Sequence, residues 1–250
     1  MSGHSHWATI RRKKSAVDAK RGKLFTRLAR EITVAAREGG GDPDANLRLQ
    51  YAIDRARENN MPKDNIERAI KRGTGDLKEG NQLEEVYYEG YAPHGIAMMI
   101  MCVTDNRNRA VAEIRHVLNK GGGSMAEAGS VAWQFSRKAI FEIPADKHDP
   151  DEVFELAVEA GAEDVEFGDE AIEVIGPVEA FKQISNHLKE AGIRPSEAEV
   201  RMTPNNEIEL NAEQSMQVLK VIENLEELDD VQDVYSSMTI SDALMAELDA

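Results

Sequence analysis

Four adjacent cations, Arg11 to Lys14, are the side chains of this sequence best suited to a defined chemistry, the binding of phosphate groups. Guanidinium and ammonium groups neutralise phosphodiesters with little selectivity for base. Further basic residues follow at steps of three, four and three residues, which places them on one face of a helix. An indole and two imidazoles near the N-terminus are suited to stack on exposed bases. The candidate nucleic-acid-binding residues in this region are His4, His6, Trp7, Arg11, Arg12, Lys13, Lys14, Lys20, Lys23, Arg27 and Arg30.

A second group of candidate residues directly follows a predicted strand. Asp105 or Asn106 is a typical residue to cap the start of a helix. Arg107 and Arg109 would then lie near the positive end of the helix dipole, where an anion can bind. Helix capping alone is the simpler interpretation of this segment. Arg107 and Arg109 complete the candidate set.

Charge is divided unequally along the chain. The first 75 residues contain 17 Lys and Arg against 9 Asp and Glu, a formal net charge of +8, whereas the remaining 175 contain 13 against 37, a net charge of −24. A basic end on an acidic chain predicts contact with a polyanion, with the N-terminal end leading. The alternative is that this basic region packs against the acidic domains of its own chain. For the helical series of cations, a solvated helix face is a further alternative.

Apolar periodicity predicts three helices in the N-terminal region. The first is expected from about residue 15 to residue 38, with Phe25, Leu28 and Ile32 on its apolar stripe. The second is expected to open at residues 42–44, where proline follows an aspartate, and the third to start at Pro62 and to stop at Gly73. Residues 1–80 are therefore predicted to form a basic arm and a three-helix nucleic-acid-binding domain.

Beyond residue 80 the pattern changes to strands mixed with helices. Strands are predicted at 86–91, 96–104 and 130–135, with a helix at 108–119. Residues 137–204 show a βαββαβ order, which is typical of a four-stranded antiparallel sheet with two helices on one face. The tail, with a helix at 212–228 and a strand at 231–235, is too small for a core of its own. We therefore expect an α+β multidomain fold, in which two ferredoxin-like domains follow the three helices. Residues 137–204 would be inserted into a discontinuous domain formed by 81–136 and 205–250.

No catalytic site is predicted, so we expect a protein that is not an enzyme and has no cofactor or small-molecule substrate. His116 lies in a helical pattern without a nucleophile partner, and no Ser-His-Asp or Cys-His arrangement is recognisable. The glycine run at 121–123 follows a helix and precedes a strand, the reverse of a phosphate-binding loop. One weak metal candidate is His4, which after removal of the initiator methionine could chelate Cu(II) or Ni(II) with the new amino terminus.

The cellular compartment is predicted from three features. Cys102 is the only cysteine, which excludes an intramolecular disulfide and favours a reducing compartment. The apolar run at 96–103 is too short to span a bilayer, and the N-terminus lacks a secretory signal. We therefore expect a cytoplasmic protein that does not associate with membranes.

Seven segments spread over nearly the whole chain resemble the YebC/PmpR family. These segments are Gly3–Trp7, Arg21–Phe25, Asp44–Arg48, Asn60–Ile66, Tyr88–Tyr91, Thr104–Arg109 and Leu228–Val231. The resemblance implies a helical first domain and two α+β domains, one inserted in the other. It also implies a cytoplasmic transcriptional regulator that binds DNA. Relatives that include a mitochondrial translational activator imply an alternative, a factor that acts on the ribosome and aids difficult peptide synthesis.

The sequence departs from the family pattern at two places. The family usually has Lys where this chain has His6, which replaces a permanent charge by one that titrates near neutrality. The turn at 92–95 has fewer glycines than usual. If that loop contacts a partner, the contact here would differ in shape.

The sequence therefore predicts a non-enzymatic regulator of gene expression whose N-terminal domain binds nucleic acid. The first hypothesis is transcriptional control through DNA, and the second is a ribosome-associated translation factor that contacts rRNA or tRNA. No recognition helix with base-reading Asn, Gln and Arg side chains is evident, which argues against tight sequence specificity. A third hypothesis is a module that binds other proteins through its acidic sheets.

Overall fold

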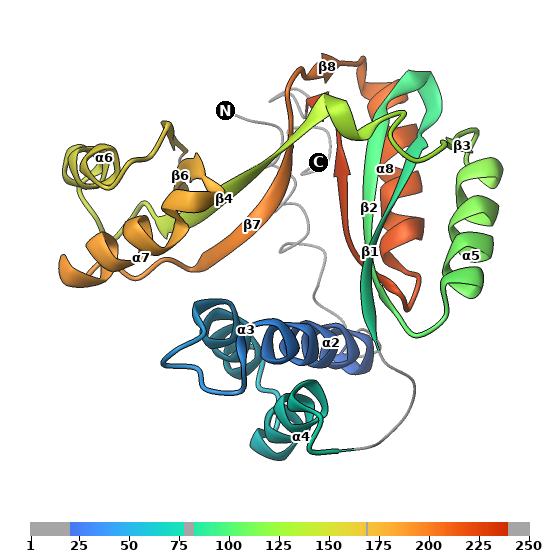
Figure 1. The fold of residues 1–250 in the computed structure, drawn as a ribbon. Helices are drawn as coiled ribbons and strands as arrows, with labels where there is room; N and C mark the ends of the chain where they lie inside the picture. Colours follow the sequence, from blue (N-terminus) through green and yellow to red (C-terminus); the bar gives the residue numbers. More distant parts are fainter. Residues whose placement is uncertain (1–20, 78–82, 169, 240–250) are drawn as a thin grey trace.

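The computed structural model describes residues 21–77, 83–168 and 170–239, which form one helical part and two sheet-containing parts (Figure 1). The helical part consists of α2 (Arg21–Gly39), α3 (Leu47–Glu58) and α4 (Lys63–Thr74). Leu28, Ile32, Leu49, Ile53 and Ile66 belong to its hydrophobic core. The three-helix N-terminal region predicted from the sequence is confirmed; residues 15–20 of the first predicted helix lie outside the described residues.

Helix α3 begins at Leu47, later than the predicted opening at residues 42–44. The buried side chain of Asn46 explains the shift. Its Oδ1 accepts a hydrogen bond from the N–H of Leu49 (3.1 Å), while its Nδ2 donates to the carbonyls of Ala35 (2.8 Å) and Gly40 (2.9 Å). One amide therefore caps the start of α3 and satisfies carbonyls at the end of α2.

Helix α4 ends at Thr74, and Gly75 adopts the left-handed conformation (φ 83°) that terminates it. The prediction that Gly73 stops the helix is therefore wrong. Gly73 lies inside the helix, and its lack of a side chain has a packing reason. A Cβ at this position would be only 2.4 Å from the carbonyl oxygen of Thr33 and 2.7 Å from the Cβ of Ala36. The glycine allows α2 and α4 to pack backbone against backbone.

The first sheet combines distant parts of the chain in the order β3-β1-β2-β9, with all neighbours antiparallel. Helices α5 and α8 cover one face, and their buried residues share a single core with β2 and β9. Strands β8 and β10 form a separate two-stranded parallel sheet. The elements are β1 (Glu84–Tyr91), η2 (Pro93–Gly95), β2 (Ala97–Thr104), α5 (Arg107–Lys120), β3 (Ser124–Met125), β8 (Ile208–Glu209), α8 (Ala212–Glu226), β9 (Val231–Ser236) and β10 (Met238–Thr239).

The second sheet has the strand order β5-β6-β4-β7 and is antiparallel throughout. Its βαββαβ connectivity is the one predicted, and helices α6 and α7 cover one face around Phe141, Val174 and Ile184. In Figure 1 these helices lie on the side of the sheet away from β1, β2 and β9. The elements are β4 (Phe135–Pro144), α6 (Pro150–Glu159), β5 (Asp164–Phe167), β6 (Ala171–Pro177), η4 (Val178–Ala180), α7 (Phe181–Glu190) and β7 (Glu197–Pro204). The predicted α+β multidomain fold is confirmed, and we propose the predicted domain boundaries for it.

The strand predicted at 130–135 is wrong, because most of this segment is a loop that ends in a 3-10 turn, η3 (Ala132–Gln134). The carboxylate of Glu89, a buried residue of β1, accepts the backbone N–H groups of Gly129 (2.6 Å), Val131 (2.6 Å) and Ala132 (2.9 Å). These are donors that a strand would give to a neighbouring strand. The buried carboxylate of Glu89 therefore takes the place of a neighbouring strand as the hydrogen-bond acceptor for this segment.

The helical part contacts both sheet-containing parts. Val34 of α2 packs with Leu83 and Val103 at the end of the first sheet. Tyr51 of α3 hydrogen-bonds Ser185 of α7 (2.8 Å) and meets the ring of Phe181 edge-on at 6.2 Å. The helices therefore contact both sheet-containing parts, and in Figure 1 they lie below the two sheets.

Candidate nucleic-acid interface

The predicted phosphate-binding cations of helix one are oriented partly toward the rest of the chain. Arg27 Nη2 lies 3.8 Å from Asp233 Oδ1 of β9, and Lys23 is half-buried without an acidic partner in the described ranges. Arg30 donates from Nη1 to the carbonyl of Val103 (3.0 Å) and to Asp230 Oδ1 (3.0 Å). The face of α2 opposite the helical core is therefore covered by the first sheet. In the sequence, the apolar residue Val34 on this face is the signal that could have predicted this contact. The remaining candidates, His4, His6, Trp7, Arg11, Arg12, Lys13, Lys14 and Lys20, lie outside the described residues.

Asp230 is the point at which the helical part, β2 and α5 meet. Its side chain is 2% exposed. Besides Arg30, it accepts from Thr104 Oγ1 (3.0 Å) and from both Nε (2.9 Å) and Nη2 (2.8 Å) of Arg109. Two of the segments that carry the family resemblance, Thr104–Arg109 and Leu228–Val231, therefore meet at one buried carboxylate together with Arg30 of α2.

The start of α5 is capped and its cations are paired within the chain. Asn106 Oδ1 accepts the N–H of Arg109 (3.1 Å), which confirms the expected cap. Arg109 also pairs with Asp105 (2.9 Å), and Arg107 Nε donates to Glu84 (2.8 Å). The carboxylates of Glu84, Asp105 and Asp230 thus occupy the positions that an external anion would take.

A cluster of exposed cations lies on α4, where the sequence analysis did not place one. Arg68, Lys71 and Arg72 are exposed, lie on the side of the helix away from buried Ile66 and Ala69, and have no acidic partner among the described residues. Lys71 and Arg72 also complement the C-terminal end of the helix dipole. The i, i+3, i+4 spacing of the three residues places them on one helix face, so the sequence alone could have predicted this cluster. This α4 cluster is therefore a group of exposed cations in the helical part.

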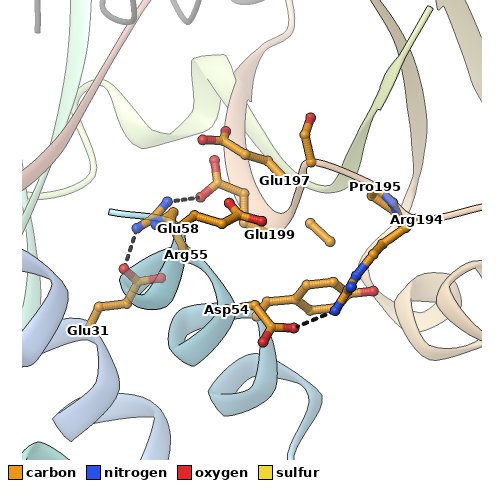
Figure 2. Close-up of a pocket in the computed structure, with 11 residues that line it drawn as sticks. Glu31, Asp54, Arg55, Glu58, Arg194, Pro195, Glu197 and Glu199 are labelled. Atoms are coloured by element: carbon orange, nitrogen blue, oxygen red, sulfur yellow. Dashed lines mark hydrogen bonds and ion pairs between the residues drawn. The ribbon is translucent and has the colours of Figure 1, made fainter. Parts of the chain in front are cut away.

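A small pocket separates α3 from the start of β7, and its walls are acidic (Figure 2). Five carboxylates and two guanidinium groups line it. Arg55 is paired with Glu31 and, at 3.7 Å, with Glu199, while Arg194 lies 3.4 Å from Asp54. The cavity volume is about 40 Å³, whereas small-molecule sites usually enclose roughly 300 Å³ or more. The pocket can admit a single side chain, and its charge opposes phosphate.

Cys102 and the possible metal ligands are the other reactive groups of the described residues. Cys102 is fully buried, and burial raises the pKa of its thiol to about 12, so it is not a ready nucleophile. Within 21–77, 83–168 and 170–239, no three His, Cys, Asp or Glu residues are grouped as a metal site. In the same ranges, no helix has the length and apolar character needed to cross a membrane.

Fold and site together define an α+β protein of three parts, in which a basic helical part contacts two acidic sheet-containing parts. Two family models cover most of the chain: the TACO1/YebC protein N-terminal domain matches residues 5–76, and the TACO1/YebC second and third domain matches residues 83–238. The chain belongs to the TACO1/YebC family.

Curated relatives and a solved structure agree with this assignment. A probable transcriptional regulatory protein of Chlorobaculum tepidum is 52% identical over 250 residues, covering 100% of this chain and 99% of the relative. A protein of the same name from Acidithiobacillus ferrooxidans is 54% identical with the same coverage. The crystal structure of a conserved hypothetical protein from Aquifex aeolicus superposes with a TM-score of 0.86 at 45% identity, over 95% of this chain and 98% of that one.

Proposed function

We propose that this protein is a non-enzymatic regulator of gene expression that binds nucleic acid through its N-terminal part, with DNA as the target in transcriptional control. The observation that carries the proposal is the separation of charge, +8 in the first 75 residues against −24 in the rest. A phosphate polymer is attracted to one end and repelled by the other, so it meets the molecule in one orientation. The names of the curated relatives support the regulatory role.

The proposed contacts include Lys23 and the α4 cluster of Arg68, Lys71 and Arg72, which have no acidic partner among the described residues. They also include the arm at residues 4–14 and Lys20, which lie outside the described residues. Arg27, Arg30, Arg107 and Arg109 are paired with carboxylates of the same chain. These four would contact phosphate only after their ion pairs open.

The second candidate function is action on the ribosome through rRNA or tRNA, and the surroundings of α2 favour it. A helix that reads DNA must present a free face to the major groove. Helix α2 is covered by α3 and α4 on one side and by the first sheet on the other, and the exposed face of α4 includes Asp64 and Glu67 beside its cations. Contacts to a phosphate backbone, without base readout, suit structured RNA as well as DNA.

Charge reversal of the arm tests the common part of both hypotheses. Full-length protein with Arg11, Arg12, Lys13 and Lys14 changed to Glu is compared with the unchanged protein by fluorescence anisotropy on a 20-bp duplex (about two helical turns) and on an rRNA stem-loop of similar length, over a range of KCl. Each lost phosphate contact should reduce the slope of log affinity against log salt by about 0.9 on duplex DNA. Lys182→Glu with Lys189→Glu on exposed positions of α7 is the control and should leave the slope unchanged. Equal binding by the arm variant and the unchanged protein would remove the arm from the interface.

Sedimentation of cell lysate through sucrose gradients at low and high salt, followed by mapping of crosslinked nucleic acid, separates the two hypotheses. Salt-sensitive migration with ribosomes and crosslinks to rRNA would favour the translational function. Recovery of discrete promoter fragments would favour the transcriptional one. Crosslinks to neither polymer would contradict both.

A further inference from the structure

Three large apolar side chains are exposed together at the β5 edge of the second sheet. Phe154 and Val158 of α6 are 45% and 52% exposed, and Phe167 of β5 is 48% exposed. The ring centroids of Phe154 and Phe167 lie 6.4 Å apart. Phe154 and Val158 are four residues apart on one helix and therefore share a face. We call these three residues the apolar patch.

The core of the second sheet does not account for the apolar patch. Val153 and Ala157 of α6 pack with Val165 of β5 in that core, and all three are buried. The patch residues lie on the flank of α6 and at the end of β5, outside this contact. Single exposed apolar residues are ordinary, but a contiguous group with two aromatic rings is typical of the centre of a protein interface.

Negative charge surrounds the patch. Residues 146–168, which contain it, hold 9 Asp and Glu against 1 Lys, a formal net charge of −8. Asp151 and Glu155 each lie one helical turn before a patch residue, and both are exposed without a cationic partner in the described part of the chain. The surface therefore has an apolar centre and an acidic rim.

The charge of this segment decides which occupant fits. Nucleic acids and anionic membranes are repelled by a surface of the same sign. A symmetric dimer through this face would bring two segments of net charge −8 together, because a twofold axis places the same patch on both sides. Complementary charge instead requires a protein surface that is basic and also offers apolar side chains to the centre.

We propose that the apolar patch docks a basic segment of another protein. Leucine or aromatic side chains of that segment contact Phe154, Val158 and Phe167, while its lysine and arginine side chains pair with the carboxylates of the rim. A specific interface buries about 800 Å² on each partner, more than three half-exposed side chains provide, so the rim belongs to the contact as well.

The partner contacts side chains and does not extend the sheet. Strand β5 is an end strand and, within the described residues, pairs only with β6. The carboxylate of Asp164 accepts the backbone N–H of Val165 (2.8 Å), so this donor is already used. A charged side chain on an end strand also discourages pairing with another strand.

The docking surface is separate from the proposed nucleic-acid interface. In Figure 1, α6 lies at the end of the second sheet and away from α4. Binding of a basic protein at α6 and β5 therefore leaves the cations of the helical part accessible. The inference does not depend on the proposed function, and its test contains no nucleic acid.

Three synthetic peptides of about 14 residues, or four helical turns, serve as probes of the full-length protein. The first has lysine and arginine on one helical face and leucine and phenylalanine on the other. The second has serine in place of the apolar residues, and the third has glutamate in place of the cations. Fluorescence anisotropy should show the tightest binding for the first peptide, with at least tenfold weaker binding of the second and of the third, because both centre and rim contribute.

Two matched pairs of substitutions locate the binding site. Phe154→Ala with Phe167→Ala should weaken binding of the first peptide at least tenfold, because the aromatic centre is lost while every charge is kept. Ile208→Ala with Met216→Ala is the control, since both side chains are exposed apolar residues outside the second sheet. The control should leave the affinity unchanged, and circular dichroism verifies folding of both variants.

Val158→Glu separates apolar docking from simple charge attraction and replaces the phenylalanine variant if that one is unfolded. Val158 is exposed, and glutamate has a higher helix propensity than valine, so the helix should be retained. The substitution adds a negative charge but removes part of the apolar centre. Affinity for the first peptide should therefore fall about fivefold or more, whereas a contact made by charge alone would become tighter.

Four results would overturn the docking. They are no binding of the first peptide, equal binding of the first and second peptides, equal losses in the two alanine variants, and tighter binding by Val158→Glu. Analytical ultracentrifugation of the protein alone tests the remaining occupant. Self-association that the Phe154→Ala and Phe167→Ala pair abolishes would assign the apolar patch to a second copy of this chain and would refute the basic partner.

Discussion

At the scale of single residues, Asp230 joins three elements of the fold. It is buried, and it accepts hydrogen bonds from Arg30, Arg109 and Thr104, which belong to three different elements. A buried charge is tolerated only when such partners surround it. The sequence shows each of these residues but not that they meet, because they are separated by up to 200 positions.

Asp230→Ala should lower the free energy of unfolding by about 3 kcal/mol, because it removes the carboxylate that pairs with Arg30 and leaves Arg109 with Asp105 alone. Urea denaturation followed by circular dichroism measures this change. Asp229→Ala is the matched control: its side chain is exposed, and its backbone carbonyl, which also accepts from Arg30, is retained. The control should change stability by less than about 0.5 kcal/mol. Similar losses in the two variants would show that net charge, and not this contact, is responsible.

Glu89 provides a prediction for pH dependence. Burial by itself raises the pKa of this carboxylate, but the N–H groups of Gly129, Val131 and Ala132 outweigh it and hold the pKa below its usual value of 4.5. A lowered pKa in the folded state stabilises the protein above the unfolded pKa, and this contribution is lost as pH falls through the folded value.

Glu89→Gln should therefore cost about 2 kcal/mol at neutral pH, where charge-assisted bonds are lost. The difference from the unchanged protein should shrink as pH falls below about 4.5, because the native carboxylate then becomes protonated as well. Unfolding free energies at several pH values check this. Glu127→Gln, exposed in the same loop, should show no such trend. A gap that stays constant with pH would contradict the assigned hydrogen bonds.

At the scale of elements, the contact between α2 and α4 depends on the absence of a side chain. Gly73→Ala should destabilise the protein by about 1–3 kcal/mol, because the added methyl group overlaps the backbone of α2 and overpacking outweighs the better helix propensity of alanine. Gly22→Ala in α2 is the control, since a Cβ there meets nothing within 4 Å. The control should stabilise by about 0.5–1 kcal/mol. Thermal unfolding of both variants gives the sign, and stabilisation by both would refute the close approach.

Local sequence patterns predicted most of the elements but not their surroundings. The strand predicted at 231–235 corresponds to β9, since alternation and helix periodicity are local signals. Residues 130–135 were predicted as a strand because nothing local reveals that Glu89, some 40 positions away, accepts their N–H groups. Gly73 likewise has the appearance of a helix stop when the neighbouring helix is unknown.

The surroundings of the candidate site residues could not be predicted from the sequence, for the same reason. Arg27 and Arg30 have the spacing of a free cationic stripe, but their partners Asp233 and Asp230 come from the far end of the chain. The α4 cluster has an equally simple spacing and was overlooked. The sequence does not show that Glu166, Glu173, Glu142 and Glu197 lie side by side across the second sheet, because only the strand register brings these four residues together.

At the scale of the whole molecule, the two sheets differ in how they are assembled from the chain. The core of the first sheet joins residues 92–118 to residues 218–238, with the entire second sheet between them in sequence. The core of the second sheet comes only from residues 139–198. Continuous segments that contain their own core are the ones able to fold alone. The second sheet therefore has the properties of an inserted domain.

A fragment of residues 135–204 should consequently fold by itself, with a cooperative thermal transition in circular dichroism and dispersed amide signals in NMR. At this size its stability should be only a few kcal/mol, roughly 5 or less. A fragment of residues 83–134 should remain unfolded, because Val218, Ile222 and Val234 no longer cover its apolar face. Mixing it with a fragment of residues 205–250 should restore structure, since these two pieces together supply the first core. A folded 83–134 fragment, or an unfolded 135–204 fragment, would contradict the proposed insertion of residues 137–204.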